Sequence, residues 1–212
     1  MIKKIRVGVI GIGYLGKFHL EKYRLNKSTD LTCLVDVNEK NLDLIDSPMI
    51  FKTKNYMDIR DKVDAVSIVT PTVTHFKIAK YFLENKIHVL LEKPMTETVR
   101  QAQILNNLAK KNKCILQIGH LEQFNPAVKK LRLQHDKPEF IEVHRLCKFN
   151  PRATDVDVVL DLMIHDIDIV LSLIDKNIKK ISVSGKKVIT KLIDIANAVS
   201  YTHLRAHETN SN

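Results

Sequence analysis

Short apolar runs alternate with amphipathic stretches from the start of the chain to about Gly119. Such runs are typical of buried parallel strands, and the stretches between them have the spacing of helices that cover a sheet. The predicted strands are Ile5–Ile10, Leu31–Val35, Ala65–Val69, His88–Glu92 and Ile115–Ile118, with a weaker one at Ile50–Lys52. The predicted helices are Leu15–Leu25, Glu39–Leu44, His75–Asn85 and Glu97–Lys111, the last with Thr96 as its N-cap. The pattern predicts an α/β domain with a doubly wound parallel sheet.

The pattern of apolar and polar residues changes after Gly119. The predicted elements are a helix from about Pro126, a strand Phe140–Arg145, a helix Val158–Leu173, and strands Ile178–Lys187 and Ile193–Val199. Alternation of apolar and polar residues in the later strands is typical of a sheet that is covered on one face only. We therefore expect a first domain over residues 1–119 and an α+β domain with an open sheet over residues 120–199.

The last segment, residues 200–212, has neither strand alternation nor a helical face. Its His203 and His207 have the i, i+4 spacing of a metal pair, but an artefactual or disordered tail is the interpretation we favour. On this interpretation the second domain is incomplete, because its open sheet lacks strands.

A glycine-rich turn follows the first predicted strand and opens the first predicted helix. Its pattern is G-x-G-x-x-G, formed by Gly11, Gly13, Tyr14, Leu15 and Gly16 together with the intervening Ile12. The first glycine permits a tight turn, the second lets the backbone approach a pyrophosphate, and the third allows close helix packing. The alternative is that the glycines serve only a tight turn.

Asp36 ends the second predicted strand, at the distance from the glycines where a carboxylate accepts hydrogen bonds from the ribose hydroxyls of a dinucleotide. Because this carboxylate would repel a 2′-phosphate, the sequence favours NAD over NADP as the cofactor. Together the turn and Asp36 predict a Rossmann dinucleotide-binding domain.

Three further motifs follow in order: Thr70-Pro71-x-x-x-His75, Glu92-Lys93-Pro94, and Asp161-x-x-x-His165. With the glycine turn they resemble the Gfo/Idh/MocA family of NAD(P)-dependent sugar oxidoreductases, over about Val7 to Ala198. The resemblance implies a Rossmann domain followed by an α/β domain with an open sheet, and a substrate held between them over the nicotinamide. It also implies that family oligomers use this sheet, so we expect a homo-oligomer when the protein is full length.

Oxidation of a secondary alcohol needs a base and a hydrogen-bond donor on one oxygen atom. Lys93, at the carboxyl end of a parallel strand, is placed to orient the hydroxyl, although an ordinary surface lysine is the alternative. Asp161 and His165 are four residues apart on a predicted helix, hence on one face. The family resemblance implies that both are active-site residues. Asp166 and Asp168 are more doubtful, and with no second histidine or cysteine at ligand spacing we expect no metal site.

Other residues are expected near the ligands. The cofactor is expected to be bordered by Thr70, Pro71, His75, Glu92 and Gly119. Substrate contacts are expected from Lys93, His120, Asn125, Arg152, Asp161 and His165. Arg145, Lys148 and Arg152 suit a diphosphate, but solvated surface charge is an equal alternative for them.

The segment from Phe149 to Asp168 is similar to the branch of the family that includes UDP-N-acetylglucosamine 3-dehydrogenases, enzymes that prepare an amino sugar for lipid A. Three functions stay open. They are an NAD-dependent nucleotide-sugar dehydrogenase, a dehydrogenase of free sugars or inositol, and a non-catalytic NAD-binding module.

Composition narrows the class of protein. The longest apolar stretches are far shorter than the ~18 residues of a membrane span, so we expect no membrane association. The chain has 3 cysteines without a C-x-x-C motif, as expected of a cytoplasmic protein. The net charge of +10 suits nucleic acid, but tryptophan is absent and the lysines are scattered, so we expect solvated faces and no nucleic-acid partner.

Overall fold

The computed structural model describes residues 3–45, 47–134, 138–148, 156–174 and 176–202. The chain divides into two compact units, Met1–Gly119 and His120–Asn212. Each unit is described by itself.

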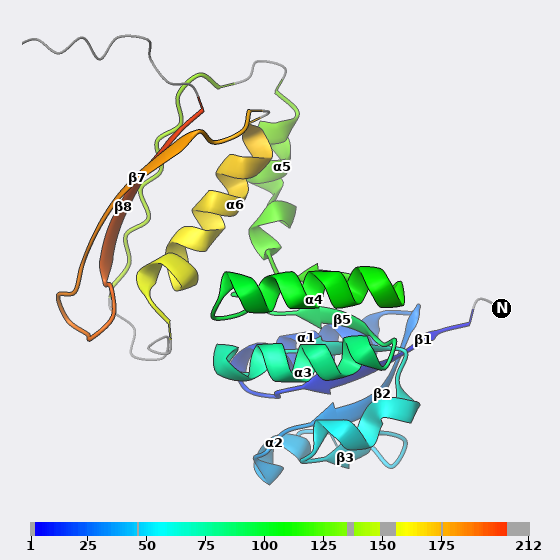
Figure 1. Cartoon of the computed structure of the whole chain (residues 1–212). Coiled ribbons are helices and arrows are strands. Elements are labelled where there is room, and N and C mark those ends of the chain that lie inside the picture. Colours follow the sequence, from blue (N-terminus) through cyan, green and yellow to red (C-terminus); the bar gives the residue numbers. More distant parts are fainter. Residues whose placement is uncertain (1–2, 46, 135–137, 149–155, 175, 203–212) are drawn as a thin grey trace, which may run out of the picture. The chain divides into compact units, whose positions relative to one another are not determined.

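The first unit is built on one sheet of six parallel strands (Figure 1). In chain order the strands are β1 (Ile5–Ile10), β2 (Thr29–Val35), β3 (Phe51–Thr53), β4 (Ala65–Ile68), β5 (His88–Leu91) and β6 (Leu116–Ile118). They lie in the order β3-β2-β1-β4-β5-β6, so the direction of winding reverses between β1 and β4. In open α/β sheets, ligands bind at the carboxyl edge beside such a reversal. The predicted doubly wound Rossmann sheet is confirmed.

Helices cover both faces of this sheet. They are α1 (Tyr14–Leu25), α2 (Glu39–Leu42), the 3₁₀ helix η1 (Tyr56–Lys62), α3 (Thr72–Glu84) and α4 (Val99–Asn112). On one face Leu20 of α1 packs with Val9 and Leu34, and on the other Phe82 of α3 packs with Ile68. Successive strand residues face opposite layers, so the strands are apolar on both sides, as a sheet buried on both faces requires.

Two helices of the first unit start two or more residues away from the predicted position. Helix α4 begins at Val99, because the hydroxyl of Thr98, and not that of Thr96, accepts a hydrogen bond from the Gln101 amide (3.3 Å). The Thr96 hydroxyl instead donates to the Thr98 carbonyl (2.9 Å). Helix α3 begins three residues early, at Thr72, with Pro71 at its N-cap, so His75 lies within the first turns of the helix.

The second unit contains short helices and one antiparallel strand pair. The elements are the 3₁₀ helix η2 (Leu121–Phe124), α5 (Pro126–Arg132), the π-helical turn η3 (Val159–Met163), α6 (Ile164–Leu173), β7 (Lys180–Lys186) and β8 (Ile195–Tyr201). The predicted strand Phe140–Arg145 is wrong: among the described residues this segment has no strand partner. Its alternation of apolar and polar residues was not sufficient to form a strand without such a partner.

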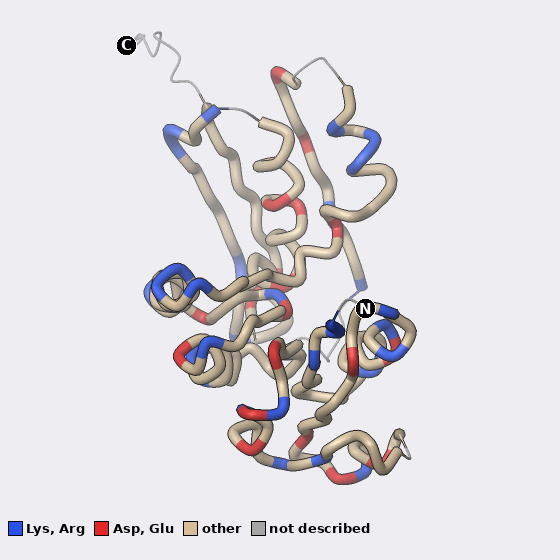
Figure 2. The backbone as a smooth tube through the Cα atoms, turned by 90° about the vertical axis from the view of Figure 1, so that its right-hand side faces the viewer, with Lys and Arg blue, Asp and Glu red and all other residues tan. Residues whose placement is uncertain are grey.

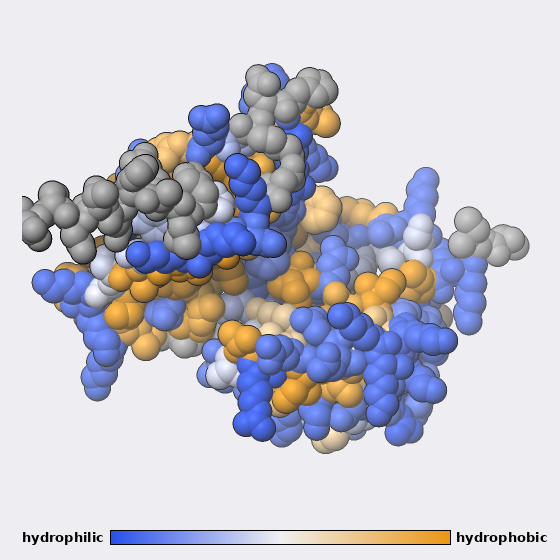
Figure 3. All heavy atoms as spheres, turned by 45° about the horizontal axis from the view of Figure 1, so that its top comes forward, coloured by the Kyte–Doolittle hydropathy of each residue, from blue (hydrophilic) through white to orange (hydrophobic). Residues whose placement is uncertain are grey.

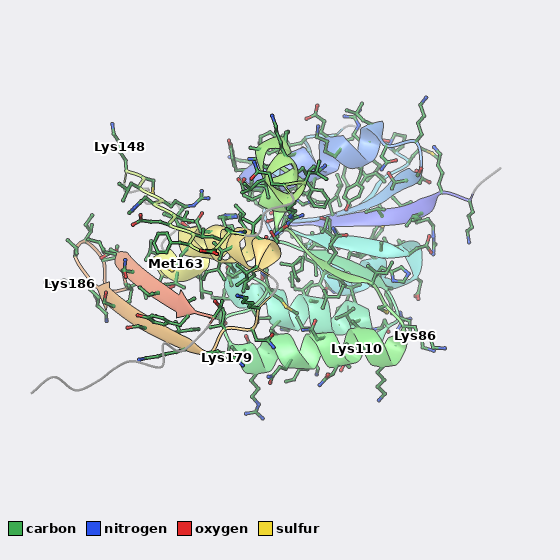
Figure 4. The ribbon with its side chains drawn as sticks, turned by 90° about the horizontal axis from the view of Figure 1, so that it is seen from above. Lys86, Lys110, Lys148, Met163, Lys179 and Lys186 are labelled. Carbon is green, nitrogen blue, oxygen red and sulfur yellow. The ribbon has the colours of Figure 1, made fainter. Side chains whose placement is uncertain are left out.

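The predicted helix Val158–Leu173 is two elements. A π-helical turn comes first, in which the Ile164 amide donates to the carbonyl of Val159, and α6 follows. Met163, labelled in Figure 4, is the last residue of the π turn. The start is capped by Asp157, whose Oδ1 accepts from the amides of Val159 (3.1 Å) and Leu160 (3.0 Å).

The β7–β8 hairpin is open to solvent. Its apolar residues, among them Val183, Ile195 and Tyr201, are exposed, and apolar side chains lie at the surface on the left of Figure 3. Strand β8 extends to Tyr201, beyond the predicted end at Val199, because Tyr201 pairs with Lys180. The loop between the strands is held by the Asp194 carboxylate, which accepts from the amides of Val188, Ile189 and Thr190 at 2.7–3.0 Å. These hydrogen bonds lower the pKa of Asp194 far below its usual range. His203 and His207 lie outside the described residues.

Candidate functional site

The glycine turn joins β1 to α1 at the carboxyl edge of the sheet. Gly11 has a φ of +86°, and a Cβ there would lie 2.6 Å from the Val69 carbonyl oxygen. A Cβ on Gly16 would collide with the Gly11 carbonyl, so these two glycines are required by the fold. Gly13 is different, because a Cβ there would meet no atom within 4 Å. The open flank of Gly13 lies at the N-terminus of α1, where backbone amides and the helix dipole suit a pyrophosphate.

Tyr14 and Leu15 follow Gly13 and are exposed. The Tyr14 ring contacts Phe18 edge to face, with 5.4 Å between ring centroids. Both residues lie in the first turn of α1, within the glycine pattern that was predicted to bind the dinucleotide.

Asp36 is buried directly after β2 and is hydrogen-bonded to the glycine turn. Its Oδ2 accepts from the Ile12 amide (2.6 Å) and from Nδ2 of Asn41 (3.1 Å), and its Oδ1 accepts from the Asn38 amide (2.8 Å). A carboxylate has about four acceptor sites, so one stays available for a ribose hydroxyl. The glycine turn and Asp36 together suit a dinucleotide.

The loop after β4 contains Thr70 and Pro71 and leads into α3. Thr70 accepts a hydrogen bond from the Thr74 hydroxyl (2.7 Å). His75 is buried, with Nε2 2.8 Å from the Thr70 carbonyl and Nδ1 2.9 Å from the Pro94 carbonyl. The ring therefore links the loop after β4 to the turn after β5.

Glu92 directly follows β5 and is buried. Its Oε1 lies 3.0 Å from His19 Nε2, and its Oε2 accepts from the Lys93 amide (3.2 Å). A Cβ on Gly119 would come within 2.8 Å of Oε1, so the carboxylate fills the space that this glycine leaves. Burial acts to raise the pKa of Glu92, but the hydrogen bond and charge of His19, with the Lys93 contacts, outweigh it and lower the pKa below its usual value.

His19 is a residue that the sequence reasoning missed. It lies on α1, three residues after Gly16, and its Nδ1 is 2.7 Å from the buried Ser67 hydroxyl of β4. The available signal was a polar residue within a helix that packs on an apolar sheet, next to the glycine turn.

Lys93 is half-buried between Glu92 and the buried Pro94, at the carboxyl edge of the sheet. The Lys93–Pro94 peptide is cis. The first-unit residues that were predicted for the site all follow the carboxyl ends of strands β1, β2, β4, β5 and β6. They are the glycine turn, Asp36, Thr70, Pro71, His75, Glu92, Lys93 and Gly119. The topology therefore brings them to one edge.

The second unit holds the other predicted residues. Asp161 lies in the π turn and His165 in the first turn of α6, both half-buried. His120 precedes η2, and its Nδ1 is 3.9 Å from Oδ2 of Asp168. Asn125 caps α5 by accepting from the Ala127 amide (3.0 Å) and donates to Glu122 (3.0 Å).

The two doubtful acids of α6 have protein partners. Asp166 forms a two-pronged ion pair with Arg145, with Nη2 2.7 Å from Oδ1 and Nε 2.9 Å from Oδ2. Asp168 accepts a hydrogen bond from the amide of Gln123. Arg152, predicted to contact substrate, lies outside the described residues. Among the residues that are described, no group of three or more His, Cys, Asp or Glu is arranged to hold a metal ion.

Comparison with known proteins connects this edge to a family. Residues 5–120, more than half of the chain, match the family described as "Oxidoreductase family, NAD-binding Rossmann fold" (GFO_IDH_MocA). UDP-N-acetylglucosamine 3-dehydrogenase from Acidithiobacillus ferrooxidans is 36% identical over 196 residues, which are 92% of this chain and 62% of that protein. A solved structure of an A. ferrooxidans protein of that name matches with a TM-score of 0.84 at 35% identity, covering 93% of this chain and 65% of that one.

Inositol dehydrogenases are also similar. Myo-inositol 2-dehydrogenase from Thermotoga maritima is 24% identical over 208 residues, which are 92% of this chain and 62% of that protein. The chain thus spans somewhat less than two thirds of the length of these curated relatives. The predicted resemblance is confirmed, and the chain belongs to the Gfo/Idh/MocA family of oxidoreductases, whose matched domain is an NAD-binding Rossmann fold.

Proposed function

We propose that the protein is an NAD-dependent dehydrogenase that transfers a hydride between a secondary alcohol of a nucleotide sugar and nicotinamide. The observation that carries this proposal is the carboxyl edge of the sheet in the first unit. The open flank of Gly13 lies there after β1, Asp36 after β2 and Lys93 after β5. Family membership supports the reaction class. The relative named UDP-N-acetylglucosamine 3-dehydrogenase supports UDP-N-acetylglucosamine as the substrate to test first, and with it a place in lipid A synthesis.

The residues of the first unit would hold the cofactor. The amides at the start of α1 bind its pyrophosphate past Gly13, and Asp36 accepts from its ribose. We propose NAD over NADP because the Asp36 carboxylate would repel a 2′-phosphate. When bound, the nicotinamide ring supplies the hydride acceptor.

The remaining chemistry belongs to three side chains. Lys93 orients the substrate hydroxyl and stabilises the negative charge that develops on its oxygen. His165 takes the proton, and Asp161 orients the imidazole or binds a sugar hydroxyl. These three roles, like the substrate contacts assigned to His120, Asn125 and Arg152, are predictions from the sequence pattern.

The first experiment incubates the protein with NAD and UDP-N-acetylglucosamine and follows the absorbance of NADH. We expect a rise in the wild type and none in Lys93→Met, while calorimetry finds the same NAD affinity in both. Lys110→Met, at an exposed position on α4, is the matched control and keeps the wild-type rate. Absence of turnover in the wild type with intact NAD binding would favour a non-catalytic NAD-binding module.

Free sugars or inositol are the second candidate substrates, because a relative named myo-inositol 2-dehydrogenase aligns over 92% of this chain. A panel of unphosphorylated polyols in the same assay separates the two classes. Faster turnover with a polyol than with the nucleotide sugar would replace the first proposal.

The cellular location and the partners of the protein are also part of the proposal. Cys33, Cys114 and Cys147 are free thiols, which supports a reducing cytoplasm. Lysines and arginines are spread over many helices and loops (Figure 2), which supports a small-molecule substrate and no nucleic-acid partner. In the described part of the chain, none of the helices has the length and apolar character needed to span a membrane. A homo-oligomer is expected of the full-length enzyme and is tested by light scattering.

A further inference from the structure

We propose that two histidines, the half-buried His19 and the buried His75, are positioning residues that hold the turn Glu92-Lys93-Pro94 from its two sides and thereby aim the Lys93 amine. The inference rests on the proposed dehydrogenase function, because it assigns a role toward Lys93 in that reaction. It adds His19 of α1, which the sequence did not predict for the site, and gives His75 of α3, which was expected to border the cofactor, a role toward Lys93.

His19 holds the turn from the side of Glu92. The side chain of His19 is 14% exposed and that of Glu92 is 9% exposed, with 3.0 Å between Nε2 and Oε1. An ionised carboxylate only accepts hydrogen bonds, so Nε2 carries the proton and donates. The other nitrogen, Nδ1, lies 2.7 Å from the hydroxyl of Ser67, which has no exposed surface. The imidazole is therefore fixed at both ends and fixes the carboxylate in turn.

Glu92 passes this constraint to the lysine. The oxygen that His19 leaves available, Oε2, accepts a hydrogen bond from the backbone amide of Lys93 (3.2 Å). Gly119 closes the other flank of the carboxylate, since a Cβ there would be 2.8 Å from Oε1. The orientation of the peptide that carries Lys93 thus depends on a hydrogen-bonded chain that begins at Ser67.

His75 holds the turn from the side of Pro94. Its ring is 1% exposed and lies between two carbonyl oxygens, that of Pro94 at 2.9 Å from Nδ1 and that of Thr70 at 2.8 Å from Nε2. Carbonyl oxygens only accept, so a neutral ring donates to one of them and a doubly protonated ring donates to both. Proline has no amide proton, so its carbonyl is the backbone hydrogen-bonding group that residue 94 offers. His75 uses that group.

The position of Lys93 explains why it needs anchors from the neighbouring helices α1 and α3. Lys93 lies beyond the end of β5, where the ladder of the sheet no longer fixes the backbone. An error of about 1 Å in the position of a reacting group can reduce a rate about a hundredfold. Anchors on both neighbours of Lys93 remove the freedom of the peptide on each side.

The test compares disruptive and conservative variants. His19→Leu removes the donor to Glu92, whereas His19→Gln keeps an amide donor. His75→Phe removes both ring nitrogens but keeps a ring of similar size. Ser67→Ala removes the partner of His19 Nδ1 and leaves the imidazole in place. The matched control is His88→Gln, at the amino end of β5, where Nδ1 accepts from the Ile115 amide (3.0 Å). Thermal melts first identify which variants are folded.

The readout does not require turnover. Acetic anhydride labels lysine amines, and mass spectrometry gives the labelling rate of Lys93 relative to the exposed Lys86 and Lys110, both labelled in Figure 4. We expect the relative rate of Lys93 to change at least about threefold in His19→Leu and His75→Phe, and kcat to fall at least about tenfold with NAD affinity within about threefold. His19→Gln recovers most of both effects, and Ser67→Ala is intermediate.

The outcomes separate this inference from the proposed function. An altered Lys93 labelling rate in a protein that oxidises no sugar would retain the positioning role and reject the dehydrogenase. Turnover in the wild type with unchanged labelling and kcat in the folded variants would reject the positioning role. Unfolding of all four variants while His88→Gln stays folded would also reject it, because the histidines would then serve stability alone.

Discussion

The backbone amide of Ile12, inside the glycine turn, donates a 2.6 Å hydrogen bond to the buried carboxylate of Asp36, 24 residues further along the chain. The same carboxylate accepts from Asn38 and Asn41, so it connects the end of β1 to the start of α2. The acid that would bind the ribose is therefore also the acid that shapes the turn for the pyrophosphate.

Replacement of Asp36 should affect the fold and the cofactor together. Asp36→Ala leaves the buried Ile12 amide without its partner, which costs about 1–3 kcal/mol of unfolding free energy, and we expect NAD affinity to fall at least about tenfold. Denaturant melts and calorimetry measure the two effects. Asp30→Asn, at an exposed position of β2, the strand that precedes Asp36, is the control and should change neither. A variant Asp36→Ala with wild-type NAD affinity would remove this residue from the cofactor site.

The glycines of the turn should separate into two kinds. Gly13→Ala adds a methyl group into open space, so the free energy of unfolding should stay within about 0.5 kcal/mol, while NAD binding weakens at least about tenfold. Gly16→Ala places its methyl group against the Gly11 carbonyl and should destabilise the fold itself. Circular dichroism melts with and without NAD distinguish them. Equal losses of stability in both variants would contradict the assignment of Gly13 to the ligand.

The stability of the first unit should depend on the protonation of Glu92. Its pKa is lowered in the folded state, so its contribution is complete above the usual value of 4.5 and is lost as the pH falls through the lower folded value. Glu92→Gln removes this linkage, and its free energy of unfolding should decline less steeply than that of the wild type below about pH 4.5. Urea titrations over a pH series measure the slopes. Glu21→Gln, exposed on α1, should retain the wild-type slope; identical slopes for all three proteins would refute the role of Glu92.

The ion pair between Arg145 and Asp166 should be a structural contact within the second unit. Both side chains are partly exposed, at 35% and 13%, so screening limits the two-pronged pair to a coupling energy of about 1 kcal/mol. A double-mutant cycle of Arg145→Leu and Asp166→Leu, followed by chemical denaturation, measures it. NAD affinity should be unchanged in all of these variants. A coupling energy near zero, or a loss of NAD binding, would contradict a purely structural pair.

The sequence was most informative about the first unit. Strand β1 is observed as predicted, and β2, β4 and β5 differ by at most two residues at either end, because runs that are apolar on both faces have few other environments available. The start of α4 was missed because Thr96 and Thr98 are both suitable caps, and only the folded backbone decides which hydroxyl meets a free amide. The π turn was missed because it covers only five residues, Val159–Met163. Over so short a stretch the apolar pattern of a π turn hardly differs from that of an α-helix.

The residues of the candidate site also differ in how far the sequence could predict them. Gly11, Gly13, Gly16 and Asp36 were predictable because their chemistry follows from local spacing. His19 was not, since its partners are 48 and 73 residues away in the chain. The strand predicted at Phe140–Arg145 failed for a related reason: alternation describes one strand, whereas a sheet needs a neighbour.

The exposed β7–β8 hairpin should open locally on a shorter time scale than the sheet of the first unit. Two strands without a covered apolar face are marginally stable in water, and the turn that holds them depends on one carboxylate, that of Asp194. We therefore expect a lower free energy of local opening here than in β1 and β4, and the amides of Lys180–Lys186 and Ile195–Tyr201 should exchange with deuterium long before those of these two strands. We therefore expect the hairpin to exchange as a separate cooperative unit, with a protection that rises when another surface covers it.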